Sequence, residues 1–196
     1  MTNASTLSRQ SILGILKETG AMLQGHFLLS SGLHSDRYLQ CARLLAHPRH
    51  AQTLGQALAL LAPAKPDLVL SPALGGIVIG HETARSCGVR ALFSEREDGA
   101  MTLRRGFELQ PGEKVLVVED VITTGKSTGE VIALARDRGA VVLGALAIVC
   151  RAERAPDLGV PVQSLIHLPL AAFPKADCPL CRQGLPLVKP GSRTIP

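Results

Sequence analysis

Aromatic residues are scarce in this sequence, which has four Phe, one Tyr and no Trp among its 196 residues. A core built around large rings is therefore excluded, and the chain must pack mainly through Leu, Val, Ile and Ala. Aliphatic runs of this kind are typical of helices packed on a buried parallel sheet. The scarcity of rings also argues against a surface on which nucleic-acid bases stack.

Long apolar runs are absent as well. The longest, Val141–Val149, contains Gly144 and is far shorter than the roughly 20 residues needed to span a bilayer. The first residues, MTNASTLSRQ, lack a basic start followed by an apolar stretch, so we expect no signal peptide. The five cysteines, an odd number lying mostly in apolar segments, indicate free thiols in a reducing compartment. The sequence therefore predicts a cytoplasmic protein with no membrane partner.

No block of five or six Lys or Arg residues occurs, although the formal net charge is +5. This modest basic excess fits anionic partners, either phosphorylated small molecules or nucleic acids. The length suits one domain with a substantial core, and we treat 1–196 as a single domain.

Strands and helices alternate through the central part of the chain, which predicts an α/β fold with a parallel sheet and right-handed crossovers. Residues 95–110 are polar and contain glycines, so a mobile loop or hairpin is expected there. The Pro-rich stretch after Leu170 is expected to be a tail packed on the domain. The predicted helices span 8–19, 48–61, 77–87 and 126–138, and the predicted strands lie within 25–39 and at 68–70, 89–93, 115–118 and 141–149.

The segment 115–131, VLVVEDVITTGKSTGEV, carries the most chemical information. Its aliphatic start predicts a buried strand that presents Glu119 and Asp120 at its carboxyl end, where open α/β sheets bind ligands. The small residues that follow leave backbone N–H groups available at a helix start, which favours a phosphate. Two carboxylates beside a phosphate indicate a sugar phosphate, because they can accept hydrogen bonds from its hydroxyls. A Walker P-loop is excluded, since Asp120 occupies the position of its first glycine.

The run EDVITTGKST resembles the phosphoribosyl pyrophosphate (PRPP) signature of type I phosphoribosyltransferases. The resemblance implies that Glu119 and Asp120 contact the ribose hydroxyls and that residues 123–128 hold the 5-phosphate. Gly75 and Gly76, in SPALGGIVIGHETAR, resemble the turn of that family that binds pyrophosphate. The PRPP site implied in this way comprises Glu119, Asp120, Val121, Ile122, Thr123, Thr124, Gly125, Lys126, Ser127, Gly75 and Gly76.

The wider resemblance, over nearly the whole chain, is to orotate phosphoribosyltransferases. GHFLLSSGLHSDRY resembles their substrate segment, and TLRRGF resembles the loop that closes over their active site. The better-known bacterial members have lysines where this chain has Ser30 and Gly75. The resemblance implies a substrate-binding hood at 20–45 and 170–196, Mg²⁺ held mainly by PRPP with no protein metal ligand, and a homodimer that shares the mobile loop. It also implies an orotate site of Thr123, Arg151 and Tyr38, and catalytic roles for Arg96, Arg104, Arg105 and Asp120.

Two other functions stay open at this stage. A purine phosphoribosyltransferase would use the same chemistry, although a purine has no carboxylate for Arg151 to pair with. A regulator that senses PRPP and binds DNA or RNA would keep the phosphate site. We expect no nucleic-acid partner, because about 20 residues before the substrate-like segment are too few for a DNA-binding module and no basic cluster marks an RNA-binding face.

The pair Cys178-Pro-Leu-Cys181 has the spacing of metal ligands or of a redox motif. One such pair lacks the second pair that a structural zinc site needs, and it does not start a helix beside a βαβ unit. We therefore interpret it as a packed turn of the tail. His34 lies in the substrate-like segment, and the sequence leaves open whether it contacts substrate or is structural.

Overall fold

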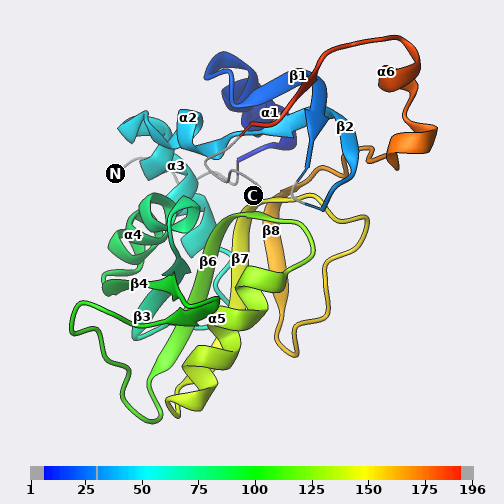
Figure 1. Cartoon of the computed structure of the whole chain (residues 1–196). Coiled ribbons are helices and arrows are strands. Elements are labelled where there is room, and N and C mark those ends of the chain that lie inside the picture. The colour runs from blue at the N-terminus through cyan, green and yellow to red at the C-terminus, as the bar shows by residue number, and fades with distance from the viewer. Residues whose placement is uncertain (1–6, 30, 191–196) are drawn as a thin grey trace.

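A six-stranded sheet forms the centre of the molecule in the computed structural model, which describes residues 7–29 and 31–190 (Figure 1). Ser30 lies outside the described residues. The strand order is β5-β4-β3-β6-β7-β8, and the strands are parallel except for β5, which pairs antiparallel with β4. The strands are β3 (Leu68–Pro72), β4 (Arg90–Glu97), β5 (Ala100–Thr102), β6 (Lys114–Ile122), β7 (Val141–Cys150) and β8 (Val162–His167).

Helices cover both faces of this sheet because its central strands are apolar on both sides. Val69 and Val118 pack in one buried cluster with α3 and α4, whereas Leu70 and Val117 pack in a second cluster with α5. This alternation is the two-residue period of strand side chains. α4 connects β3 to β4 and α5 connects β6 to β7, as crossovers between parallel strands do. These helices are α3 (Pro48–Ala59), α4 (Gly75–Cys87) and α5 (Lys126–Asp137).

A smaller three-stranded sheet lies over the carboxyl ends of the main strands (Figure 1). β1 and β2 form an antiparallel hairpin, and the tail adds β9 parallel to β1. The two segments assigned to the hood thus share one sheet. Its elements and the helices beside it are α1 (Arg9–Glu18), β1 (Met22–Leu28), β2 (His34–Leu39), α2 (Cys41–Leu45), the 3-10 helix η1 (Lys175–Asp177), α6 (Pro179–Arg182) and β9 (Leu187–Val188).

The predicted α/β fold is confirmed, and each predicted helix and strand is present with bounds shifted by a few residues. β8 was not predicted, because VQSLIH is an edge strand in which only Ile166 is fully buried. Residues 95–110, predicted as a mobile loop or hairpin, start with the β4–β5 hairpin. Its turn residues Asp98 and Gly99 have φ of 48° and 86°. Among the described residues, no helix combines the length and apolar character needed to cross a membrane.

Candidate active site

A pocket of about 820 Å³ lies between the hood and the carboxyl ends of β6 and β7. The hood contributes Leu28 and Tyr38, and the tail contributes Lys189. The pocket brings together seven residues predicted as site residues: Tyr38, Gly75, Asp120, Val121, Thr123, Thr124 and Arg151. The sheet and the hood are therefore both needed to enclose it.

β6 extends to Ile122, beyond the predicted end at Val118, so both acidic residues belong to the strand. Neighbouring side chains of a strand point to opposite faces. Asp120 accordingly lines the pocket, whereas the Glu119 carboxylate accepts a hydrogen bond from the Thr128 hydroxyl of α5. The predicted acidic pair is therefore divided between the two sides of β6.

Burial dominates the titration of both carboxyl groups. Loss of solvent raises the pKa of Glu119 to about 7; the Thr128 hydrogen bond opposes this shift and the neighbouring Asp120 adds to it. Burial also raises the pKa of Asp120, against the effect of a hydrogen bond from the Val121 backbone N–H. Buried carboxylates with raised pKa values favour a ligand that supplies hydroxyl donors or positive charge.

Gly75 lies directly against the Asp120 carboxylate. A Cβ atom on Gly75 would lie 2.7 Å from Oδ1 and 2.8 Å from Oδ2 of Asp120, so a side chain here would displace the Asp120 carboxylate from its present position. A Cβ on Gly76 would lie 3.1 Å from the Val118 carbonyl oxygen. The two glycines therefore let the start of α4 pack against β6, and Gly75 leaves the carboxylate of Asp120 open to the pocket.

The loop from β6 to α5 supplies the other polar part of the pocket. Thr123 and Thr124 line it, and Gly125 turns the chain into α5 with φ of 77°. The Lys126 N–H donates to the Thr124 hydroxyl oxygen, 3.4 Å away. Since Gly125 has no side chain with which to cap the helix, the next backbone N–H groups of α5 remain available to an anion. Ile122 is buried in the core, so its side chain does not line the pocket.

Arg151 follows β7, and its backbone N–H donates to the Ile122 carbonyl, 2.8 Å away. Its Nε is buried and has no hydrogen-bond partner among the described residues. Burial lowers the pKa of Arg151, and the nearby Tyr38 and Cys41 partly offset this shift. Burial also raises the pKa of Tyr38, and the positive charge of Arg151 opposes that shift. A carboxylate ligand would satisfy both the charge and the unpaired N–H of this guanidinium.

The predicted catalytic arginines do not line this pocket. Arg105 forms a bidentate pair with Glu95, at 2.7 and 2.9 Å, and Arg104 lies 3.5 Å from Glu97. Arg96 pairs with Glu130 of α5. All three ion pairs lie at the surface, where such pairs contribute little stability and exchange readily.

Five further residues of the predicted PRPP site do not line the pocket: Glu119, Gly76, Gly125, Lys126 and Ser127. Lys189 lines it but was not predicted. No sequence pattern marked it, because the pairing of β9 with β1 that brings the tail to the pocket joins residues far apart in the chain.

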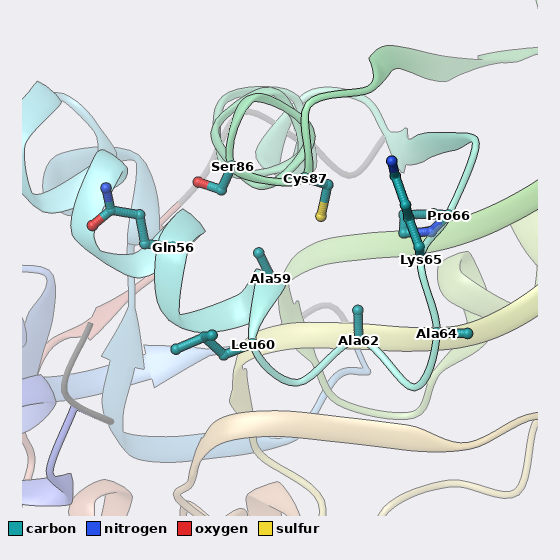
Figure 2. Close-up of a pocket in the computed structure, with 9 residues that line it drawn as sticks. All are labelled: Gln56, Ala59, Leu60, Ala62, Ala64, Lys65, Pro66, Ser86 and Cys87. Carbon is teal, nitrogen blue, oxygen red and sulfur yellow. The ribbon is translucent and has the colours of Figure 1, made fainter. Parts of the chain in front are cut away.

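A second, smaller pocket of about 420 Å³ lies between the carboxyl ends of α3 and α4 (Figure 2). Small and aliphatic residues of 56–66 form most of its wall, with Ser86 and Cys87 opposite. Lys65 is its one charged residue, so the pocket lacks the paired groups that acid–base chemistry needs.

A cluster of nitrogen and sulfur ligand atoms lies in the hood. The imidazoles of His26 and His34 meet the thiols of Cys178 and Cys181, and one ligand atom from each lies within 4.8 Å of the others. The tail packs against the hood here, as expected. The interpretation that Cys178 and Cys181 lack a second pair of possible metal ligands is wrong. The histidines supply that pair from β1 and β2.

Comparison with known proteins gives no matching family model. The sequence is 51% identical over 190 residues to the orotate phosphoribosyltransferase of Pelotomaculum thermopropionicum, covering 96% of this chain and all of that one. It is 51% identical over 182 residues to that of Thermotoga maritima, covering 92% and 97% of the two chains. The crystal structure of orotate phosphoribosyltransferase from Aeropyrum pernix is similar with a TM-score of 0.70 and 30% identity, over 80% of this chain and 93% of that one.

Proposed function

The chain belongs to the orotate phosphoribosyltransferase family, and from this premise we propose how its pocket binds the two substrates. The enzyme transfers the phosphoribosyl group of PRPP to orotate: a bond from the anomeric carbon to a ring nitrogen forms, and the bond to pyrophosphate breaks. The products are orotidine 5-phosphate and pyrophosphate. One observation carries the proposal, namely that Asp120, Thr123, Thr124 and Arg151 line the same pocket.

PRPP occupies the part of the pocket beside β6 in this proposal. The 5-phosphate accepts hydrogen bonds from the backbone N–H groups of 123–128 at the positive end of α5. Asp120 accepts hydrogen bonds from the ribose hydroxyls, and Glu119 joins it by turning its carboxylate from Thr128 toward the pocket. The backbone of Gly75 and Gly76 faces the pyrophosphate. The close approach of Gly75 to Asp120 supports a ligand that contacts both.

Orotate binds against Arg151 and Tyr38 in this proposal, with Thr123 beside it. The buried, unsatisfied Nε of Arg151 supports a carboxylate partner, and orotate differs from other pyrimidines by carrying one. The half-buried Tyr38 offers a ring surface and a hydroxyl at the hood side of the pocket. A purine lacks the group that would satisfy Arg151.

Mg²⁺ is the cofactor that fits the oxygen atoms of this pocket. The Asp120 carboxylate lines the pocket and burial raises its pKa, so a nearby cation would favour its ionised form. We propose that PRPP would hold the ion mainly through its own hard oxygen atoms, with Asp120 as the carboxylate of this chain on the pocket side. When bound, Mg²⁺ neutralises charge on the departing pyrophosphate.

The reaction builds positive charge on the ribose and negative charge on pyrophosphate. Asp120, which lines the pocket, stabilises the positive charge of the ribose in this proposal. Arginine side chains stabilise the negative charge of the leaving group with charge-assisted hydrogen bonds, in a site closed to water. Arg96, Arg104 and Arg105 all pair with surface carboxylates of their own chain. We therefore propose a homodimer in which this loop completes the site of the second subunit.

We further propose that the enzyme works in the cytoplasm on these small molecules, without a nucleic-acid partner. All five cysteines are free thiols, which supports a reducing compartment.

The decisive experiment follows the loss of orotate absorbance with purified protein, PRPP and Mg²⁺. We expect rapid loss that requires Mg²⁺ and falls by about 10²-fold or more in Asp120→Asn, because the variant loses charge stabilisation in the transition state. Arg151→Gln should raise the KM for orotate by about 10–100-fold, the value of a charge-assisted hydrogen bond.

Arg154→Gln is the matched control, because Arg154 is exposed and does not line the pocket. Its KM for orotate should stay unchanged. Equal kinetic constants for the Arg151 and Arg154 variants would remove the orotate assignment. Pyrophosphate release with a purine or uracil in place of orotate would contradict the proposed substrate contacts.

A further inference from the structure

We propose that His26, His34, Cys178 and Cys181 form a structural zinc site that fastens the tail to the hood. The four side chains come from two strands and from a short helix with the residue that precedes it. His26 lies on β1, His34 on β2, Cys181 in α6, and Cys178 immediately before α6.

The distances between the ligand atoms fit a tetrahedral ion. Zn–N bonds of about 2.0–2.1 Å and Zn–S bonds of about 2.3 Å place tetrahedral ligand atoms about 3.3–3.8 Å apart. The Cys178 and Cys181 sulfurs lie 3.5 and 3.6 Å from His26 Nε2, and the Cys181 sulfur lies 3.3 Å from His34 Nδ1. The two imidazole nitrogens, 2.8 Å apart, need only a small outward rotation to bind the same ion.

Local structure orients each pair of ligands toward the same point. His34 pairs with Leu28, two residues from His26, so both imidazoles project from one face of the β1–β2 hairpin. Cys178 and Cys181 are three residues apart across the first turn of α6, which places both sulfurs on one side of the helix. The ring centroids of the histidines lie 4.8 Å apart.

A backbone carbonyl sets the tautomer of His26. The Leu185 carbonyl oxygen lies 2.8 Å from His26 Nδ1, so this nitrogen carries the proton and donates it. The Nε2 lone pair then faces the cluster. A ligand histidine whose second nitrogen donates to a carbonyl is the usual arrangement around zinc.

The composition of the cluster favours zinc over other metals and a structural over a catalytic role. Two thiolates and two imidazoles suit tetrahedral Zn²⁺, whereas hard cations prefer oxygen ligands. Four protein ligands leave no open position for water or substrate. His26, His34 and Cys178 are also at least 96% buried, and Cys181 is partly buried, so little of the site meets solvent.

The tail needs such a link because it has almost no apolar core. Neither hydrophobic cluster includes a described residue beyond Leu170, and Leu185, Leu187 and Val188 are 43–50% exposed. Segments too small to bury apolar surface commonly depend on a metal. Here the ion would hold β9 beside β1, and with it Lys189 and Pro190 at the wall of the active-site pocket.

The test is the metal content of the full-length protein, purified without chelator from zinc-supplemented medium. We expect about one zinc per chain in the wild type and in Cys87→Ser, a matched control because Cys87 lies far from the cluster in α4. Cys178→Ser and Cys181→Ser should retain less than about one tenth of that zinc. Equal zinc in all four proteins, or none in the wild type after incubation with Zn²⁺, would overturn the proposal.

Two measurements on the wild type cover the case in which the cysteine variants do not fold. Replacement of zinc by Co²⁺ should give the intense visible bands of tetrahedral cobalt and a thiolate charge-transfer band, whereas a weak octahedral spectrum would contradict the site. Zinc removal should increase amide hydrogen exchange in β1, β2 and 171–190 while leaving β6 and α5 unchanged. A mass lower by two hydrogens in the wild type as purified under reducing conditions, with no bound zinc, would indicate a Cys178–Cys181 disulfide in place of the metal and would also reject it. None of these readouts uses turnover, so they are independent of the proposed substrate contacts.

Discussion

Glu119 connects the stability of the fold with its chemistry. Burial raises the pKa of its carboxyl group to about 7 from an ordinary 4.5. Between these values the unfolded chain has released the proton while the folded chain keeps it, so the free energy of unfolding falls as the pH rises from about 4.5 to about 7. Above pH 7 the folded protein holds a buried carboxylate, and the loss of stability caused by burying this charge persists. The same carboxylate is the group proposed to accept hydrogen bonds from ribose.

We predict that Glu119→Gln is more stable than the wild type at pH 8 and nearly inactive. The amide keeps an acceptor for the Thr128 hydroxyl but carries no charge, so the variant avoids a cost of at most about 3 kcal/mol, the value of the pKa difference. Urea denaturation at pH 5, 6, 7 and 8 measures the free energy of unfolding of the variant and of the wild type. The stability difference should be small at pH 5 and grow with pH, and a difference independent of pH would show that Glu119 titrates normally.

Gly75 is the second residue whose identity follows from a contact in the site. Gly75→Ala should lower activity by at least about 10²-fold with the fold retained, because the added Cβ would displace the Asp120 carboxylate. Gly14→Ala is the control, because Gly14 lies inside α1 and a Cβ added there would have no other atom within 4 Å. Alanine at this helical position should stabilise the protein by about 0.5–1 kcal/mol and leave the activity unchanged. Normal activity in the Gly75 variant would mean that Asp120 does not need its present position.

At the scale of the elements, α5 joins the phosphate site to the core. Its buried face, Val131, Ile132 and Ala135, packs on the sheet. Its amino terminus follows Gly125, so no side chain of that residue caps the first N–H groups. A bound phosphate would satisfy these donors and hence stabilise the helix and the strand that precedes it.

Ribose 5-phosphate should therefore raise the melting temperature, whereas ribose should not. At a concentration of about 100 times Kd, binding stabilises the folded state by about 2.7 kcal/mol, which is roughly 5–10 °C for a chain of this size. Gly125→Ala should abolish the shift, because φ is 77° there and a Cβ would lie 2.9 Å from Pro156. Equal shifts with ribose and with ribose 5-phosphate would place the phosphate elsewhere.

The elements also show what the sequence could and could not predict. The aliphatic runs at 68–70, 115–118 and 141–149 predicted the buried strands, and the acids after 115–118 pointed to the end of β6, where Asp120 lines the pocket. Both follow from local pattern, which marks burial and strand ends. β8 was missed because edge strands carry no such pattern. Lys189 and the histidine pair were missed because they reach their neighbours only through the pairing of β9, β1 and β2.

In the molecule as a whole, the pocket has walls from three distant parts of the chain, but few cations line it. Arg151 and Lys189 are the cations among the residues that line it. The loop arginines 96, 104 and 105 pair with Glu130, Glu97 and Glu95 instead. In the proposed homodimer, the loop arginines of a second copy would add to these cations and to Mg²⁺ at the departing pyrophosphate.

Mixing two inactive variants tests this arrangement. One carries Asp120→Asn, and the other carries Arg104→Ala with Arg105→Ala. In a homodimer with shared loops, half of the randomly mixed dimers are hybrids, and each hybrid has one site with an intact Asp120 and an intact partner loop. We expect co-expression to restore about one quarter of wild-type activity per chain, while each variant alone stays inactive. Light scattering should give the mass of a dimer throughout. If mixed dimers form and no activity returns, the loop serves the site of its own chain, and the present pairing of Arg105 with Glu95 must open within one subunit.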